Sequence, residues 1–133
     1  MPLCERKPAT DEARVLLHAA ERDWKTVEVL LRHPDAPLVS LCFHAQPYIE
    51  KAMKAVLVSN AVIFRRTHDL EELANLLEQK DIELPLPKEQ LKRLNPFAVA
   101  LRYEDMELTL IDAPSIEEMM AHGRAWVGKQ IYE

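Results

Sequence analysis

His44-Ala-Gln-Pro-Tyr-Ile-Glu-Lys-Ala-Met-Lys-Ala55 is the stretch of sequence that decides the fold. It lies inside a longer segment, residues 38–62, in which apolar or small side chains recur at steps of three and four. This spacing places them on one broad face of a helix, so the segment is predicted to be the central and most buried helix. That face consists of Leu41, Ala45, Tyr48, Ala52, Ala55 and Ser59, widened by Ile49, Met53 and Val56.

Pro47 is the one residue that disagrees with this helix. Inside a helix, proline cannot donate the backbone hydrogen bond of its position, and its ring clashes with the preceding turn. The cost is about 3 kcal/mol unless a kink relieves the clash. We expect a bent helix, and the alternative is a helix that restarts at Pro47.

Residues 11–32 form a second amphipathic segment. Thr10 or Asp11 is predicted to cap its start, and Pro34 prevents its continuation. The charged side chains between the apolar positions then face water or a neighbouring subunit. The apolar face consists of Leu17, Ala20, Trp24, Val27 and Leu31.

Shorter helical segments follow. Thr67 is predicted to cap a helix over residues 69–80, and residues 88–93 form a short helix. Asn95 is predicted to cap a further helix, in which Pro96 occupies the first turn and which runs to about residue 103.

The C-terminal part combines a linker and a last helix. Residues 105–112 alternate apolar and polar side chains but have no second strand to pair with, so they are predicted to be an extended linker packed on the bundle or on a second subunit. The last helix begins near Pro114. Its apolar face consists of Ile116, Met119, Met120, Gly123, Trp126, Val127 and Ile131.

These segments predict an all-α fold, an antiparallel up-and-down helical bundle of four to five helices in which the longest three carry the core. The 133 residues fit one domain, residues 1–133, with its core over about residues 11–132. The surplus of apolar residues on the second and last long helices also predicts a homodimer.

Composition excludes several functional classes. A net charge of −5 and a pI near 5.6 argue against a general nucleic-acid coat, although a local basic site stays open. The longest apolar stretch is broken by Ser59 and Asn60, so it falls short of the roughly 18 residues of a membrane span. The start has no apolar core of a signal peptide, and we expect a cytoplasmic protein. Cys4 and Cys42 are expected to be reduced thiols, with Cys42 in the core.

The usual catalytic motifs are absent from the sequence. The five histidines lack the spacing with acidic partners that marks a zinc site, and two glycines cannot make a phosphate loop. No serine lies in a nucleophile elbow. We therefore predict no metal and no cofactor.

The 44–55 stretch, together with Arg66-Thr-His-Asp-Leu70 and Arg102-Tyr103, resembles the HEPN family of small helical domains, named for nucleotide binding in prokaryotes and higher eukaryotes. Ala19-Ala-Glu-Arg-Asp-Trp24 and Leu30-Leu31 resemble the family's first helix, so the resemblance covers roughly residues 11–132. Family members commonly carry Gln where Pro47 stands. The resemblance implies a helical bundle and a nucleotide or RNA as a binding partner.

Ribonucleases of this family carry an Arg followed after four to six residues by a His. The Arg stabilises the phosphorane charge and the His moves a proton. Arg102 is the corresponding Arg here, but the permitted His positions hold Glu107, Leu108 and Thr109. Without the His, acid–base catalysis loses a factor of about 10²–10⁴, which favours a non-catalytic protein.

The candidate binding residues come from the resembling segments. Several of them could converge on a phosphate near the start of the helix at residues 69–80, where free amides also favour anions. The alternatives are structural: Lys51 and Glu50 form bundle ion pairs, His68 anchors its turn, Arg102 stacks on or ties down the linker, and the two adjacent arginines are solvated. The candidates are Lys51, Lys54, Arg65, Arg66, His68, Arg102 and Tyr103.

Two functional hypotheses follow. The first is a non-catalytic HEPN protein that binds a nucleotide or substrate and pairs with a minimal nucleotidyltransferase in a toxin–antitoxin-like two-gene system, as the resemblance implies. The second is a HEPN ribonuclease toxin with a degenerate Arg/His motif. The sequence leaves open the ligand, the identity of the partner and the role as toxin, regulator or substrate-binding subunit.

Overall fold

The computed structural model describes residues 10–98 and 112–132, and its helices confirm the all-α prediction. No strand occurs in these two ranges. The helices are α2 (Asp11–Leu31), α3 (Leu38–Ser59), α4 (Leu70–Gln79), α5 (Lys88–Leu94) and α6 (Ala113–Val127), with a 3₁₀ turn η1 (Asn95–Ala98) after α5 and a π-helical turn η3 (Gly128–Tyr132) after α6.

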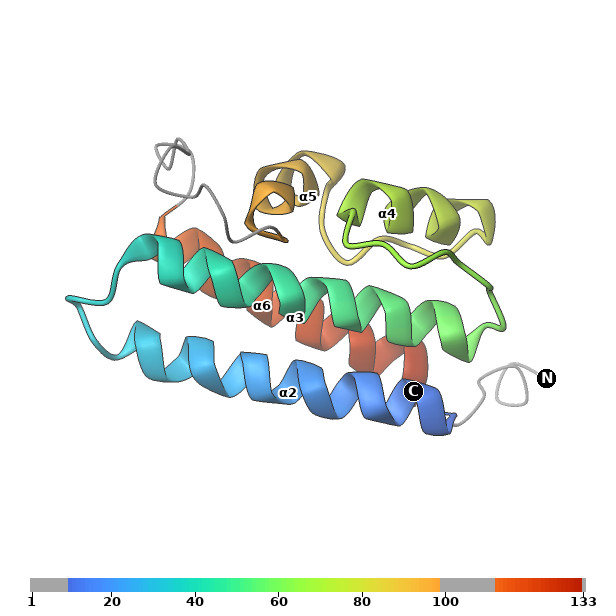
Figure 1. Cartoon of the computed structure of the whole chain (residues 1–133), viewed down its shortest axis with the longest axis horizontal. Coiled ribbons are helices and arrows are strands. Elements are labelled where there is room, and N and C mark those ends of the chain that lie inside the picture. Colours follow the sequence, from blue (N-terminus) through green and yellow to red (C-terminus); the bar gives the residue numbers. More distant parts are fainter. Residues whose placement is uncertain (1–9, 99–111, 133) are drawn as a thin grey trace.

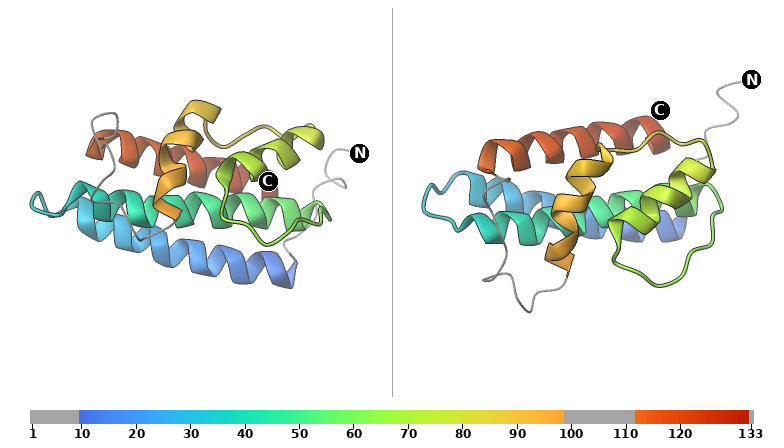
Figure 2. Two further views of the ribbon diagram at one scale, coloured as in Figure 1. Left: turned by 45° about the horizontal axis from the view of Figure 1, so that its top comes forward. Right: turned by 90° about the horizontal axis from the view of Figure 1, so that it is seen from above.

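The three longest helices lie side by side along the length of the molecule (Figure 1). α2 runs antiparallel to α3, and α6 runs in the same direction as α3. The short helices α4 and α5 lie across α3 on the side away from α2, as the view from above in Figure 2 also shows. The described chain between α3 and α6 thus contains two short helices and connecting segments, and no long helix antiparallel to α3 (Figures 1 and 2).

α3 is the centre of the core, as its broad apolar face predicts. It contacts α2, α4, α5 and α6 as well as both short turns. Side chains on nearly every side of it are buried, including Ile49, Met53 and Leu57, none of which has any exposed surface. Cys42 is also fully buried as a free thiol, and burial raises its pKa to about 11.

Side-chain caps fix where the helices begin. The Thr10 hydroxyl accepts the amide of Ala13 at 3.1 Å, which selects Thr10 as the cap of α2. The prediction that Thr67 caps the third helix was wrong. Asp69 is the N-cap of α4. The Thr67 hydroxyl instead accepts a hydrogen bond from the Asp69 amide at 3.1 Å, just before the helix begins.

Asn95 also has a different role from the one predicted. Its backbone is helical (φ −52°, ψ −42°), so α5 passes into η1 without a new cap. The Asn95 side chain instead reaches the start of α4, where its Oδ1 accepts the Leu70 amide at 2.8 Å and its Nδ2 donates to Asp69 Oδ1 at 2.9 Å.

α3 continues through Pro47 as one helix, so the alternative of a restart at this residue was wrong. The helix ends at Ser59 rather than at the predicted residue 62 because Ala61 adopts a left-handed conformation (φ 57°). The amides of Ala61 and Val62 then donate to the carbonyls of Val58 and Leu57, both at 3.0 Å, which closes the last turn.

Some of the predicted features lie outside the described residues. These are Cys4, nearly all of the proposed linker at 105–112, and the candidate residues Arg102 and Tyr103. Among the described residues, no helix has both the length and the apolar character to cross a bilayer.

Candidate functional site

Five of the seven predicted binding residues fall in the described part of the chain. Lys51 and Lys54 lie on α3, and Arg65, Arg66 and His68 lie on the segment that connects α3 to α4. The structure therefore tells which of these five side chains meet and which do not.

Lys54 and His68 meet at a buried carboxylate, Glu50, which is only 6% exposed. Glu50 Oε2 lies 3.0 Å from Lys54 Nζ and 2.9 Å from His68 Nδ1. Glu50 Oε1 accepts a hydrogen bond from Gln46 Nε2 at 3.1 Å, and the same amide group also donates to the His68 carbonyl at 3.2 Å. We call these four residues the Glu50 centre.

The Glu50 centre keeps its carboxylate ionised. Burial alone would raise the pKa of Glu50, but hydrogen bonds from His68, Lys54 and Gln46 together hold this pKa below the ordinary value of 4.5. A carboxylate can only accept hydrogen bonds, so His68 Nδ1 carries a proton towards it. Because this contact uses Nδ1, Nε2 is the nitrogen that stays free, and the imidazole side chain is 67% exposed.

The remaining cations do not join this centre. Lys51 Nζ lies 2.6 Å from Asp23 on α2, and the same carboxylate lies 3.8 Å from His44 Nδ1. Arg65 makes two hydrogen bonds to Glu72, at 2.7 and 2.8 Å. Among residues 10–98 and 112–132, Arg66 has no ion pair or hydrogen bond to its side chain. The predicted convergence on a single phosphate is therefore limited to His68 and Lys54, and both already serve Glu50.

The start of α4 lacks the free amides on which the anion argument depended. The amides of Glu71 and Glu72 donate to Asp69 Oδ1, at 2.9 and 3.4 Å, and the Leu70 amide donates to Asn95. Hydrogen bonds from Asn95 and from the two backbone amides also lower the pKa of Asp69, against a smaller opposing effect of burial. An anion there would compete with a capping carboxylate that is already in place.

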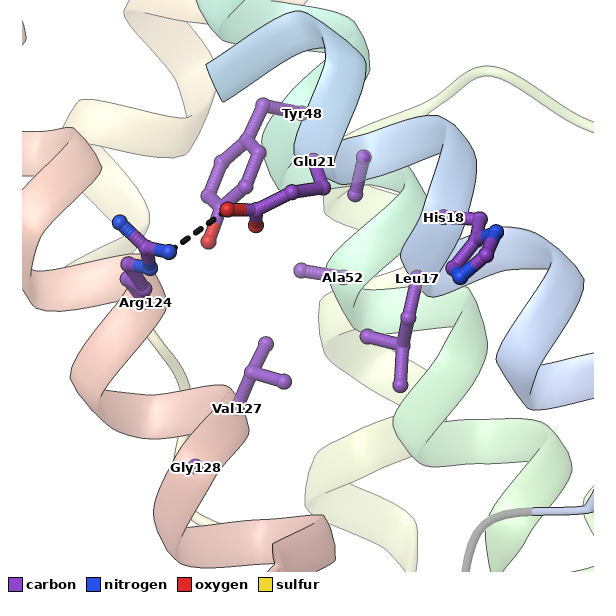
Figure 3. Close-up of a pocket in the computed structure, with 9 residues that line it drawn as sticks. Leu17, His18, Glu21, Tyr48, Ala52, Arg124, Val127 and Gly128 are labelled. Carbon is purple, nitrogen blue, oxygen red and sulfur yellow. Dashed lines mark hydrogen bonds and ion pairs between the residues drawn. The ribbon is translucent and has the colours of Figure 1, made fainter. Parts of the chain in front are cut away.

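A cavity of about 380 Å³ lies on the other side of α3, between α2, α3 and α6 (Figure 3). Its walls are mostly apolar. Three small residues line it: Ala20 on α2, Ala52 on α3 and Gly128 at the start of η3. The lining consists of Leu17, His18, Ala20, Glu21, Tyr48, Ala52, Arg124, Val127 and Gly128.

Charged and aromatic side chains meet at one edge of this cavity. Arg124 on α6 makes an ion pair with Glu21 on α2, at 2.6 Å, and its guanidinium carbon lies 4.3 Å from the centre of the Trp24 ring. The Tyr48 ring lies 5.6 Å from that of Trp24. Figure 3 shows the Tyr48 hydroxyl turned towards the place where Arg124 and Glu21 meet.

The sequence did not single out this cavity as a site. Tyr48 and Ala52 were assigned to the core face of α3, and Leu17 and Ala20 to that of α2. Ala20, Ala52 and Gly128 are small residues that the fold brings together at this cavity. They could have indicated it only if the packing of the helices had been known. Residues 10–98 and 112–132 contain no group of three or more His, Cys, Asp or Glu side chains that could hold a metal ion.

Comparison with known proteins gives a family and one curated relative. The family model of the HEPN domain matches residues 13–125. A protein of Methanocaldococcus jannaschii named "Putative toxin" is 36% identical over 87 residues, which make up 63% of this chain and 53% of the relative. The chain thus spans about half the length of that relative. No solved structure shows a significant match.

Proposed function

Because the chain belongs to the HEPN family, we propose that it acts as a non-catalytic member of a toxin–antitoxin-like pair. In this proposal it binds a nucleotide or other substrate, forms a homodimer in the cytoplasm and pairs with a minimal nucleotidyltransferase. The likeness to a protein named "Putative toxin" supports the toxin-like part.

The missing histidine carries the non-catalytic part of the proposal. Positions 107–109, where the family's ribonucleases place the proton-transferring His after Arg102, hold Glu, Leu and Thr. A carboxylate at position 107 would oppose the negative charge of a phosphate instead of relaying a proton beside an Arg. Binding without cleavage is therefore the function that these residues serve best.

The exposed edge of the Glu50 centre is the surface that we assign to the phosphate of the ligand. His68 presents Nε2 to solvent, and this nitrogen donates to a phosphate oxygen when the imidazole carries a proton on both nitrogens. Arg66, two residues earlier, is exposed without a carboxylate partner in the described residues. Lys51 and Arg65 are less suitable, because each is already paired with a carboxylate. Arg102 and Tyr103 remain candidates on the ground of the family resemblance.

Calorimetric titration with ATP tests this binding surface. Wild type is expected to bind ATP weakly, and His68→Ala and Arg66→Ala are each expected to weaken binding about tenfold or more, by the loss of one charge-assisted hydrogen bond. Arg65→Ala is the matched control, because that guanidinium is held by Glu72. Equal affinity of all four folded proteins would contradict the assignment.

Co-expression tests the pairing. The product of the neighbouring gene is expected to be a small nucleotidyltransferase that co-elutes with the chain through two purification steps. Growth inhibition by the chain alone is expected to disappear when this partner is present. Separate elution, with no effect of the partner on growth, would contradict the pairing.

A ribonuclease toxin is the second candidate function, and the Glu50 centre favours it. A carboxylate that holds one imidazole nitrogen and leaves the other exposed is the arrangement that orients a histidine for proton transfer. In this alternative His68 replaces the absent histidine of the motif.

A further inference from the structure

We infer that the cavity between α2, α3 and α6 is a binding site for an uncharged, flat heterocycle whose edge carries a ring N–H beside a carbonyl, the chemistry of a hypoxanthine, guanine or uracil base. The site goes beyond the phosphate surface proposed above. It lies on another side of α3, because Tyr48 and Glu50 are two residues apart on the helix and point in different directions.

The first observation is the Tyr48 hydroxyl, for which no described residue supplies a hydrogen bond. Tyr48 is only 3% exposed and lines the cavity, and its hydroxyl is not among the fully buried polar atoms that lack a partner. The hydroxyl therefore keeps some accessible surface, and a ligand in the cavity can supply the hydrogen-bond partner that tyrosine hydroxyls usually have. Burial raises the pKa of Tyr48, so the phenol stays protonated and offers one neutral donor to the cavity.

The second observation is the space in front of this hydroxyl. A volume of about 380 Å³ lies within the usual range of small-molecule sites. Small residues keep it open: Ala20 and Ala52 face it, and a Cβ added at Gly128 would meet nothing within 4 Å. The remaining walls, Leu17 and Val127, are apolar and suit the faces of a ring.

The third observation concerns the edge of the cavity. The ion pair between Arg124 and Glu21 places a donor and an acceptor 2.6 Å apart and uses one nitrogen and one oxygen. The second Glu21 oxygen can accept from a ring N–H while another guanidinium N–H donates to the neighbouring carbonyl. A base with this edge matches the pair without breaking it, whereas a free phosphate would meet the Glu21 carboxylate.

Inosine and adenosine form a matched pair of probes, because both lack phosphate and share the ribose and the purine outline. Inosine has the ring N–H beside a carbonyl, and adenosine has a ring acceptor beside an amino group. In calorimetric titration, inosine is expected to bind and adenosine to bind at least about tenfold more weakly. Equal affinity for both would overturn the ligand class, and no binding of inosine at millimolar concentration would overturn the site.

Two variants locate the site. Tyr48→Phe removes only the hydroxyl and is expected to weaken inosine binding about tenfold. Gly128→Leu fills the cavity from a helical position (φ −57°), so it is expected to abolish binding without lowering the melting temperature. Unchanged inosine affinity in folded Gly128→Leu would overturn the inference even if Tyr48→Phe failed to fold.

His68→Ala separates this inference from the proposed phosphate surface. It is expected to weaken ATP binding and to leave inosine binding unchanged. If His68→Ala binds both inosine and ATP as tightly as wild type does, the cavity is supported and the phosphate surface is rejected. Inosine binding that is lost in His68→Ala and kept in Gly128→Leu would reject the cavity.

Discussion

At the scale of single residues, Glu50 is the most informative side chain. An isolated carboxylate inside a helical bundle would be costly, and it would respond by taking up a proton. Three donors prevent this, and they come from two turns of α3 and from the segment before α4. The Glu50 centre therefore joins α3 to the start of α4 as well as positioning His68.

Glu50→Gln tests how much this centre contributes to stability. The change leaves Lys54, whose side chain is only 14% exposed, without its carboxylate, and we expect a loss of about 1–3 kcal/mol in the free energy of unfolding near pH 7. Because the folded-state pKa of Glu50 is lowered, its contribution is complete above the ordinary pKa of 4.5 and is lost as the pH falls through the folded-state value.

Urea denaturation of wild type and Glu50→Gln at pH 7, 5 and 3.5 measures this contribution. The stability difference should shrink at the lowest pH. Glu72→Gln serves as the control, because Glu72 pairs with the exposed Arg65 and should matter less. A difference that is as large at pH 3.5 as at pH 7 would show that the charge of Glu50 is not the cause.

At the scale of elements, the ends of α3 and α4 are closed in the same way. Ala61 and Asp81 have φ of 57° and 58°, and in each case the following amide donates to a carbonyl near the helix end at 3.0 Å. Glycine is the usual residue for this conformation, but the chain has only two glycines and neither is here. Without a glycine at position 61, the end of α3 at Ser59 could not be predicted from this rule.

Ala61→Gly should stabilise the protein. A left-handed alanine is strained by about 1–2 kcal/mol, and glycine removes this strain while losing some entropy on folding. We expect a net gain of about 0.5–1 kcal/mol, seen as a higher melting temperature. Ala125→Gly is the matched control, since it lies exposed within α6 and should destabilise by a similar amount. A decrease in stability for Ala61→Gly would contradict the assigned conformation.

Apolar periodicity predicted the ends of the long helices to within about three residues, because each long helix buries one face against the others. Local propensity could not predict contacts between distant elements. The Asn95 side chain caps a helix that begins 25 positions earlier, at Leu70, and nothing near Asn95 in the sequence indicates this. Asn95, which was predicted to cap the helix that follows it, thus caps the start of α4 instead.

The candidate site was predicted less well than the helices, for the same reason. Lys54 and His68 were named as candidates, but the buried Glu50 that joins them was seen only as an ion-pair residue. The cavity was missed entirely. Arg124 on α6 and Glu21 on α2 meet at its edge, but they are 103 positions apart in the sequence. Packing of the three long helices creates the cavity, and the path of the segment between α3 and α4 creates the Glu50 centre.

At the scale of the whole molecule, α2 has one face that no other described helix covers. Val15 is 71% exposed and Val29 is 51% exposed, and their separation of 14 positions corresponds to about four helical turns. The two valines therefore lie on the same outer face of α2. Exposed apolar residues on one face suit an interface between two copies of the chain.

A homodimer is accordingly expected in solution, with a mass twice the 15.3 kDa of the chain in light scattering after gel filtration. Val15→Glu combined with Val29→Glu should shift the protein to the monomer if the outer face of α2 forms the interface. Ile63→Glu is the control, because Ile63 is 95% exposed on the segment between α3 and α4. A wild-type mass of 15 kDa at micromolar concentration would contradict the homodimer.

Incubation of the purified protein with RNA tests most directly whether the molecule binds or cuts. The substrate should be a mixture of structured and unstructured RNA, and wild type should be compared with Arg102→Ala and His68→Ala. Because no histidine follows Arg102 at the required spacing, the RNA is predicted to stay intact with all three proteins. Cleavage by wild type that survives repurification and disappears in Arg102→Ala or His68→Ala would contradict the account and identify the protein as a ribonuclease.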